Sequence, residues 1–421
     1  MQRGLALLLT GELFTTSSAL AVQTALGWEG YQRSGDPLVL GLIGLAEFVP
    51  ALLFALPAGH AADHRDRRYV TIFGLGLIAL ATATIALDTA ANYTRVWPLY
   101  LMALFIGVGQ SYASPAYVPM LAAAVPTEEL PRVMAMNASV WQFGTIAGPV
   151  AAGLLHLLGS PAPFVVAAIA AGLGAACVAF VPRVIGRSHL VGERHSPTLA
   201  EAFAGVRFIL KTRALLGTMS LDLVAVLLGG ATALLPVFSA DVLHVGALGN
   251  GLLRAAPGAG ALVVALTLTA RPIERRVGPI LFLAVAAFGA FTLVFALSSS
   301  YLLSLAALAA LAAADMLSVF IRSTLAPLLT PPELRGRVGA VERVFIGGSN
   351  ELGAFESGLA AALIGAVPAV AIGGVLAIAA AALWAWRFPQ LRQIDRFEDA
   401  VALSRPDMPR DTRGLAPPGE A

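Results

Sequence analysis

Positively charged residues fall in every second connection between the long apolar stretches of this 421-residue chain. The intervening connections carry only Arg33 and Arg95. Because basic residues remain on the cytoplasmic side of a bilayer, this alternation predicts a polytopic membrane protein with both termini in the cytoplasm. The basic connections follow the second, fourth, sixth, eighth, tenth and last apolar stretch, and they hold Arg65, Arg67 and Arg68, then Arg132, then 183–213, then Arg271, Arg275 and Arg276, then Arg335 and Arg337, and finally 387–413.

The composition excludes several functional classes. The chain is 58% hydrophobic and only 12% charged, with a mean hydropathy of +0.80. A soluble domain usually carries about 25% charged residues. The net charge of +2 is spread over separate loops, which argues against nucleic-acid binding. We find no phosphate-binding loop, nucleophile elbow or metal-ligand spacing, so no enzyme activity, cofactor or metal is predicted. Arginine far outnumbers lysine, as in GC-rich bacteria, so the expected location is a bacterial cytoplasmic (inner) membrane.

Twelve stretches are long enough to cross a bilayer as helices, each needing about 20 apolar residues. No alternating pattern of barrel strands is present, so helices are the expected spanning form. We therefore predict an all-α polytopic protein with twelve transmembrane helices in two pseudo-symmetric six-helix bundles. The spans lie near 4–26, 38–58, 69–90, 97–123, 134–156 and 163–182, and near 214–239, 249–270, 280–297, 302–328, 338–364 and 369–388.

These spans define four regions of the chain. We expect an N-terminal bundle at 1–182, a cytoplasmic linker at 183–213, a C-terminal bundle at 214–388 and a disordered cytoplasmic tail at 389–421. The end of the linker places Ala202, Phe203, Val206 and Ile209 at helical spacing, which predicts an amphipathic helix on the membrane surface.

An internal repeat supports two related halves. The segment 126–135 matches 331–340, and the same offset places Gly148 on Gly353 and Gly153 on Gly358. Such repeats are typical of transporters, which hold substrate at the interface between their halves.

A short motif occupies the loop between the second and third helices. Gly59 permits close helix approach, and Asp63 and Arg67 are spaced for an i,i+4 ion pair, with Arg68 beside them. The register resembles the signature G-x-x-x-D-R-x-G-R-R/K of the major facilitator superfamily, although His64 and Asp66 depart from it. The resemblance implies a cytoplasmic latch between the halves that favours the outward-open state, weakened here by the added charge of Asp66. The alternative is an ordinary basic loop.

The fifth span contains a second motif. Gly144 and Gly148 form a small face for helix contact, Pro149 permits a bend, and Gly153 follows. The segment resembles the G-x-x-x-G-P-x-x-G-G pattern of exporters that exchange substrate for protons. Plain helix packing is the alternative. The stretch 103–107 in the fourth span lacks the arginine of the proton-antiporter pattern R-x-x-Q-G, which argues against proton coupling by that route.

Within the superfamily the chain is similar to the bacterial branch that includes the enterobactin exporters. This resemblance covers nearly the whole chain and implies a transporter of that fold. The segments that carry it are 221–222, 229–232, 253–257, 314–316, 321–322, 336–338 and 350–353.

Charged residues inside the apolar spans are costly, at roughly 2.5–3.5 kcal/mol for a residue at mid-bilayer, so each needs a reason. Asp315 and Arg322 lie two turns apart on one face of the tenth span, which we expect to line a cavity. Asp222 and Glu351 are the nearest acids in depth that can neutralise Arg322. Arg254 is expected to extend to the outer surface. The candidates for substrate binding or ion coupling are Glu12, Glu47, Asp222, Asp315, Arg322, Glu351 and Glu356; fixed interhelical ion pairs are the alternative.

These features predict a secondary active transporter that works by alternating access. Export of a small amphipathic molecule, such as a siderophore or a drug, is the favoured activity, with a proton or another ion as coupling partner. An importer of the same fold and a non-transporting membrane sensor or scaffold are the alternatives. We expect a monomer in the lipid bilayer that binds no nucleic acid.

Overall fold

The computed structural model describes residues 2–186 and 199–404, and within these ranges it contains helices and connections but no strand. The first half of the chain forms α1 (Gln2–Ser34), α2 (Leu38–His64), α3 (Arg67–Ala90), α4 (Trp97–Ala123), α5 (Leu130–Leu155) and α6 (Ala162–Ala179). The second half forms α9 (Arg213–Leu228), α11 (Gly246–Ala270), α12 (Val277–Leu297), α13 (Tyr301–Leu328), α14 (Arg335–Ile364) and α15 (Ala366–Arg387).

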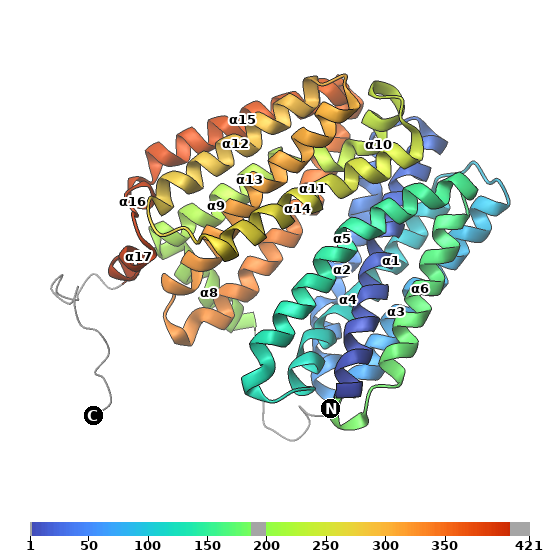
Figure 1. Ribbon diagram of the computed structural model, residues 1–421, viewed down its shortest axis with the longest axis horizontal. Coiled ribbons are helices and arrows are strands. Elements are labelled where there is room, and N and C mark those ends of the chain that lie inside the picture. Colours follow the sequence, from blue (N-terminus) through green and yellow to red (C-terminus); the bar gives the residue numbers. More distant parts are fainter. Residues whose placement is uncertain (1, 187–198, 405–421) are drawn as a thin grey trace.

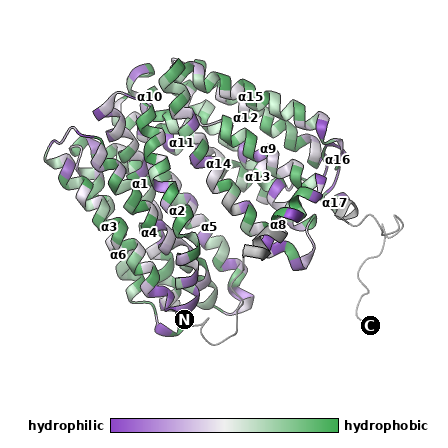
Figure 2. Cartoon of the chain, turned by 180° about the vertical axis from the view of Figure 1, so that it is seen from behind, coloured by the Kyte–Doolittle hydropathy of each residue, from purple (hydrophilic) through white to green (hydrophobic). Residues whose placement is uncertain are grey.

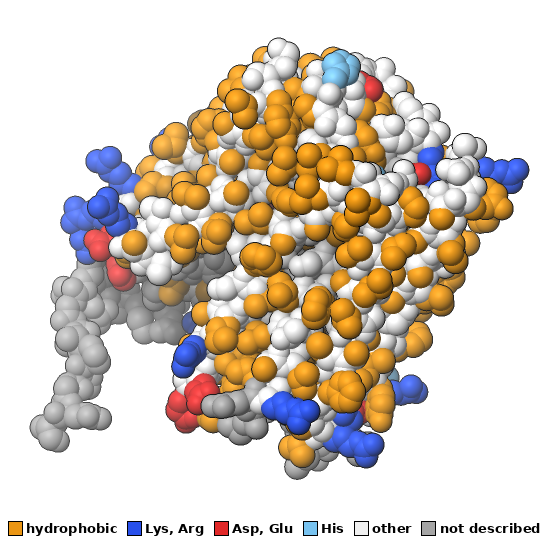
Figure 3. Space-filling model, turned by 45° about the vertical axis from the view of Figure 1, so that its right-hand side comes forward, with side chains coloured by type: hydrophobic (Ala, Val, Ile, Leu, Met, Phe, Trp, Pro, Cys, Tyr) orange, Lys and Arg blue, Asp and Glu red, His pale blue; other side chains and the backbone are white. Residues whose placement is uncertain are grey.

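Ten helical segments of the described chain are long and apolar enough to cross a membrane. The other two long helices, α4 and α14, fall outside this set but run alongside the ten, so the arrangement is compatible with twelve spans (Figure 1). Large apolar side chains such as Leu53, Leu80 and Leu302 are exposed along the sides of the helices. Hydrophobic side chains cover the face in Figure 3, with Lys and Arg mostly near its margins, and the helices in Figure 2 are predominantly hydrophobic. The exposed surface is therefore suited to lipid.

The helices pack as two bundles, as the sequence predicted. In the first bundle α1 packs against α5 and α6, and α3 against α4 and α6. In the second, α12 packs against α13 and α15, and α9 against α14 and α15. We call the end that carries Arg65, Arg132 and Arg271 the basic end, and the opposite end, which carries Gly35, Gly159 and Gly246, the far end.

The sequence repeat corresponds to a structural repeat. Each copy forms a short 3-10 turn, η1 (Thr127–Glu129) or η6 (Pro332–Leu334), that leads into α5 or α14. Gly148 of α5 packs against α1, and its counterpart Gly353 packs against α9. Gly153 contacts α11, and its counterpart Gly358 contacts α2. Equivalent glycines therefore face equivalent helices, which supports the pseudo-symmetry of the two bundles.

The seventh span is broken, whereas the sequence predicted a continuous helix near 214–239. Helix α9 ends at Leu228, and after Gly229 and Gly230 the chain continues as η4 (Ala231–Leu234), α10 (Leu235–Val237) and the π-helix η5 (Phe238–Val242). A Cβ atom on Gly230 would lie 2.1 Å from Oγ of Ser357 on α14, so the chain can pass this close only without a side chain. Discontinuous helices are typical of transporter binding sites.

The chain beyond α15 is folded as far as residue 404, which corrects the predicted disordered tail for 389–404. The backbone N–H groups of Val277 and Gly278 donate to the carbonyls of Asp395 and Ile394 at 3.2 and 2.9 Å. Leu391 and Ile394 are buried. The short helix α16 (Pro389–Arg392) and the residues that follow it therefore cover the start of α12, and α17 (Phe397–Ser404) packs against α13. Residues 405–421 lie outside the described part.

The linker contributes α7 (Arg183–Gly186) and α8 (Leu199–Lys211); residues 187–198 lie outside the described part. Helix α8 confirms the predicted helix, and it packs against α14 and α9. Val206, Phe208 and Ile209 join the apolar core of the second bundle. These described apolar residues of α8 therefore pack on the second bundle, whereas the sequence predicted that the apolar face of this helix lies on the membrane surface.

Candidate functional site

The two bundles contact each other mainly through α5 with α11 and α2 with α14. Glycines bring these helices together near the far end. A Cβ on Gly251 would lie 2.4 Å from the carbonyl oxygen of Pro149, and one on Gly41 would lie 2.9 Å from Cα of Phe355. Tyr31 of α1 also donates a hydrogen bond to Asp241 of η5 across the bundles.

The contact between α2 and α14 loosens toward the basic end. A Cβ on Gly348 would lie 3.6 Å from Phe48, a normal contact distance, while one on Gly347 or Gly59 would meet nothing within 4 Å. Figure 1 shows the two bundles together near α10 and diverging toward α8 and the start of α5. The bundles are thus closed at the far end and separated at the basic end.

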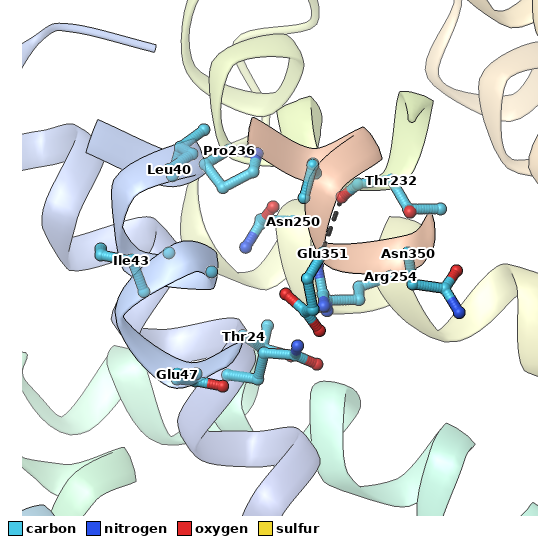
Figure 4. Close-up of a pocket in the computed structure, with 15 residues that line it drawn as sticks. Thr24, Leu40, Ile43, Glu47, Thr232, Pro236, Asn250, Arg254, Asn350 and Glu351 are labelled. Carbon is cyan, nitrogen blue, oxygen red and sulfur yellow. Dashed lines mark hydrogen bonds between the residues drawn. The ribbon is translucent and has the colours of Figure 1, made fainter. Parts of the chain in front are cut away.

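A cavity of about 300 Å³ lies between the bundles, next to the closed contacts. It is lined by α1, α2, α11, α14 and the broken seventh span. Leu40, Ile43 and Pro236 supply apolar walls (Figure 4). The polar lining consists of Gln23, Thr24, Glu47, Thr232, Asn250, Arg254, Asn350 and Glu351. Polar and charged residues thus make up about half of the lining, so the cavity combines apolar walls with more polar groups than most small-molecule sites have.

Three charged side chains meet in this cavity: Glu47 of α2, Arg254 of α11 and Glu351 of α14. They lie close enough to interact electrostatically, and all three are partly buried. Nη1 of Arg254 donates to the carbonyl of Thr232 at 3.2 Å, and Figure 4 shows its guanidinium beside Glu351, with Glu47 on the opposing helix. A Cβ on Gly44 would lie 3.0 Å from Oε2 of Glu351, so this carboxylate packs against α2.

Five of the predicted residues do not line the central cavity. Arg322 forms an ion pair with Asp222, and both are buried inside the second bundle between α13 and α9. Asp315 lies beside this pair and lines the same small pocket as Asp222. The face of α13 that we expected to line the cavity therefore points into its own bundle, and Asp222 is the acid that neutralises Arg322.

The other two acids lie elsewhere. Oε1 of Glu12 accepts a hydrogen bond from Thr16 at 3.4 Å on α1. Glu356 is exposed on α14, one turn beyond the cavity. Of the acids proposed from the sequence, Glu47 and Glu351 are the two that the structure brings together in the cavity.

The loop motif lies at the basic end of the first bundle. Arg67 pairs with Asp63 at 4.0 Å, and Asp63 is largely exposed. Asp66 caps α3 by accepting from the N–H of Arg68 at 3.1 Å, and Oδ2 pairs with Nη2 of Arg68 at 2.9 Å. Arg68 also donates to the carbonyl of Val181 at 2.8 Å. The departure from the signature at Asp66 therefore binds this loop to the end of α6 within one bundle.

The helix-five motif contacts two partners. Cβ atoms on Gly144 and Gly148 would lie 2.6 and 2.7 Å from Thr16 and Ser17 of α1. Gly153 and the carbonyl of Pro149 instead face α11 of the other bundle. The first part of the motif holds α5 in its bundle, and the second part forms the far-end contact.

Arg254 is the main residue whose position the sequence reading missed. It lines the cavity, whereas we expected it to extend to the outer surface. Asn250 precedes it by one turn and is buried, accepting a hydrogen bond from Ser239 at 3.4 Å. Their i,i+4 spacing on an apolar helix is the signal that indicates a polar face turned inward.

Comparison with known proteins agrees with this geometry. The model of a family described as Major Facilitator Superfamily matches residues 5–354. Macrolide efflux protein A of Streptococcus pyogenes is 23% identical over 146 residues, which cover 35% of this chain and 36% of that protein. Sodium-dependent phosphate transport protein 1 of Arabidopsis thaliana is 31% identical over 146 residues, 34% of this chain and 27% of that one. The matched segments thus span about a third of the length of these relatives.

Solved structures share the fold over nearly the whole chain. A POT family transporter in complex with 5-aminolevulinic acid superimposes with a TM-score of 0.73 at 13% identity, covering 92% of this chain and 96% of that one. The nucleoside transporter NupG gives 0.70 at 14% identity, covering 94% and 100%. A bacterial homologue of the lysosomal transporter Spinster, inward-facing and unoccupied, gives 0.69 at 14% identity, covering 96% and 97%. At these identities the likeness concerns the fold.

Proposed function

The chain belongs to the major facilitator superfamily of membrane transporters, and on this premise we propose that it exports a small amphipathic molecule by proton-coupled alternating access. The observation that supports this proposal most directly is the cavity of about 300 Å³ between two bundles that touch at one end only. Alternating access requires such a site to open to one side at a time. A siderophore or a drug-like compound is the proposed substrate.

Orientation follows from the charge distribution. If the basic end faces the cytoplasm, as the positive-inside rule requires, the structure is the inward-open state, and both termini lie inside. The proposed location is the bacterial cytoplasmic membrane. Export is supported by the resemblance of the segment 144–153 to the exporter pattern and by the similarity to macrolide efflux proteins.

The proposal is tested in everted membrane vesicles from a bacterial host that lacks its own efflux pumps. Vesicles are energised with a respiratory substrate, and uptake of a labelled macrolide, a ferric siderophore or a drug-like dye is measured with and without a protonophore. An exporter accumulates its substrate in everted vesicles, and the protonophore abolishes accumulation. Protein with Gly41→Trp, which blocks the α2–α14 contact, is the inactive control.

Two outcomes would replace the proposal. Accumulation in right-side-out vesicles alone would identify an importer. Absence of flux for the whole substrate panel, with folded protein in the membrane, would favour a non-transporting sensor or scaffold.

A further inference from the structure

The charged residues of the central cavity belong to different bundles. Arg254 and Glu351 lie on α11 and α14 of the second bundle, while Glu47 lies on α2 of the first. When bundles rock as rigid bodies, groups on one bundle keep their mutual distance and groups on opposite bundles do not. Arg254 therefore stays with Glu351 through the cycle, whereas Glu47 moves away from both of them.

Glu47 thus changes its electrostatic environment between states. In the structure the guanidinium of Arg254 lines the same cavity as the two carboxylates and acts on both over a longer distance than an ion pair, so the cluster carries one excess negative charge when all three groups are ionised. When the far end opens, Glu47 leaves Arg254 and needs another positive partner, because an unpaired charge in the membrane interior is costly. A proton and a cationic group of the substrate are the two species that can fill this role in turn.

The surroundings of Glu47 contain no other charged partner among the cavity-lining residues. The charged groups that act on it are Arg254 of α11 and Glu351 of α14. Helix α4 approaches it through the backbone of Gly107, at which a Cβ would lie 2.1 Å from the carbonyl oxygen of Glu47. Neutral residues of α1 and η4 complete the cavity on this side, namely Gln23, Thr24 and Thr232.

We propose that Glu47 is the exchange carboxylate, at which a proton and a singly charged organic cation with an apolar body compete. The inference rests on the proposed transport function and adds the substrate class and the residue that discriminates it. The apolar walls formed by Leu40, Ile43 and Pro236 accept the body of the cation, and the excess negative charge rejects anions of the same shape. Binding of the cation to protonated protein releases the Glu47 proton to water.

The test uses two ions of nearly identical shape and opposite charge, tetraphenylphosphonium and tetraphenylborate, with ethidium and rhodamine 6G as further cations. Binding to the purified full-length protein is measured by equilibrium dialysis and by calorimetry between pH 5.5 and 8.5. We expect the cations to bind more tightly as pH rises, with release of about one proton per cation at acid pH. Tetraphenylborate should bind at least about tenfold more weakly.

Glu47→Gln should lower cation affinity by about tenfold or more and remove its pH dependence. Glu356→Gln, the same change on the exposed face of α14, is the matched control and should bind as the unmodified chain does. Thermal unfolding establishes that both variants are folded. Proton release by the unmodified protein requires no variant, so misfolding of Glu47→Gln does not remove the test.

Equal affinity for the two tetraphenyl ions, no binding by any cation, or unchanged pH-dependent binding in Glu47→Gln would overturn the assignment. Failure of this inference and failure of transport are separable. If vesicles show substrate flux that Glu47→Gln leaves intact, transport stands and the exchange carboxylate is wrong. If cations bind with proton release but no flux occurs, the site stands and the transport proposal is wrong.

Discussion

Substituting Gly251 by alanine should open the far end of the molecule. The added Cβ would lie 2.4 Å from the carbonyl oxygen of Pro149 and 3.0 Å from Cα of Gly153. A carbon normally approaches a carbonyl oxygen to about 3.3–3.6 Å, so α5 and α11 must separate by about 1 Å. Both atoms in the way belong to the backbone, and rotamer changes cannot relieve the clash.

The added methyl group raises the free energy of the far-end-closed state alone. Overpacking of this kind costs about 1–3 kcal/mol, and it is absent when the far end is open. A difference of that size shifts the ratio of the two states by about 5- to 150-fold toward the far-end-open state. Gly→Ala also favours helix formation by about 1 kcal/mol, but this gain applies equally to both states.

Pulsed electron paramagnetic resonance measures this shift. Spin labels at Ser160→Cys and Ser299→Cys report the distance between the bundles at the far end, in a Cys177→Ser background that removes the one native cysteine. Gly251→Ala should enrich the longer distance. Gly76→Ala is the matched control, because it makes the same change within α3 at a place where the added Cβ meets nothing within 4 Å. Identical distance distributions in the two variants would refute the reasoning.

Two further predictions concern buried ion pairs. Asp222→Asn leaves Arg322 buried beside Asp315 without its main partner and should destabilise the protein by roughly 3–5 kcal/mol in equilibrium unfolding in mixed micelles. The double variant Asp222→Leu with Arg322→Met should be nearly neutral and should keep substrate flux in vesicles. A stable but inactive double variant would show that the pair acts in coupling. Asp66→Ala removes the α3 cap and the carboxylate partner of buried Arg68, which keeps its hydrogen bond to the carbonyl of Val181. Thermal unfolding should therefore show a loss of stability that Asp66→Asn, which keeps the cap acceptor, partly avoids; equal losses would contradict the capping role.

The sequence was sufficient to predict the architecture because the architecture depends on features that can be read along the chain, without knowing which residues are in contact. Apolar length identifies a spanning helix, and the position of basic residues orders the connections. The repeat went further, since Gly148 and Gly153 face the same helices as their counterparts Gly353 and Gly358 in the other bundle. Equivalent close contacts between helices require a glycine at equivalent positions, so this part of the packing can be recognised from the sequence alone.

The sequence was insufficient wherever the direction of a side chain decided the outcome. Depth in the membrane follows from counting residues, but the face of a helix that meets the cavity depends on which neighbours pack against it. Arg254 illustrates this, because it was expected to extend to the outer surface and lines the cavity instead. For Arg322 the sequence named its partner Asp222 as one of two candidates, but it placed the pair's helix face at the cavity. The break after Leu228 was missed because Gly229 and Gly230 are also compatible with tight packing in a continuous helix.

Some polar contacts lie within one bundle and others join the two bundles, and this difference determines which contacts can drive transport. A contact contributes to the conformational equilibrium only if its free energy differs between the two states. The Asp222–Arg322 pair lies within one bundle, so rigid-body rocking leaves it unchanged. The pair can therefore stabilise the fold, but it does not favour either conformational state. The hydrogen bond from Tyr31 to Asp241 crosses the bundles, but both groups are fixed parts of the chain, so it favours the same state in every cycle. Glu47 crosses the bundles and can exchange its partner with solution. It is therefore the group whose occupancy can reverse the preference between states during one turnover.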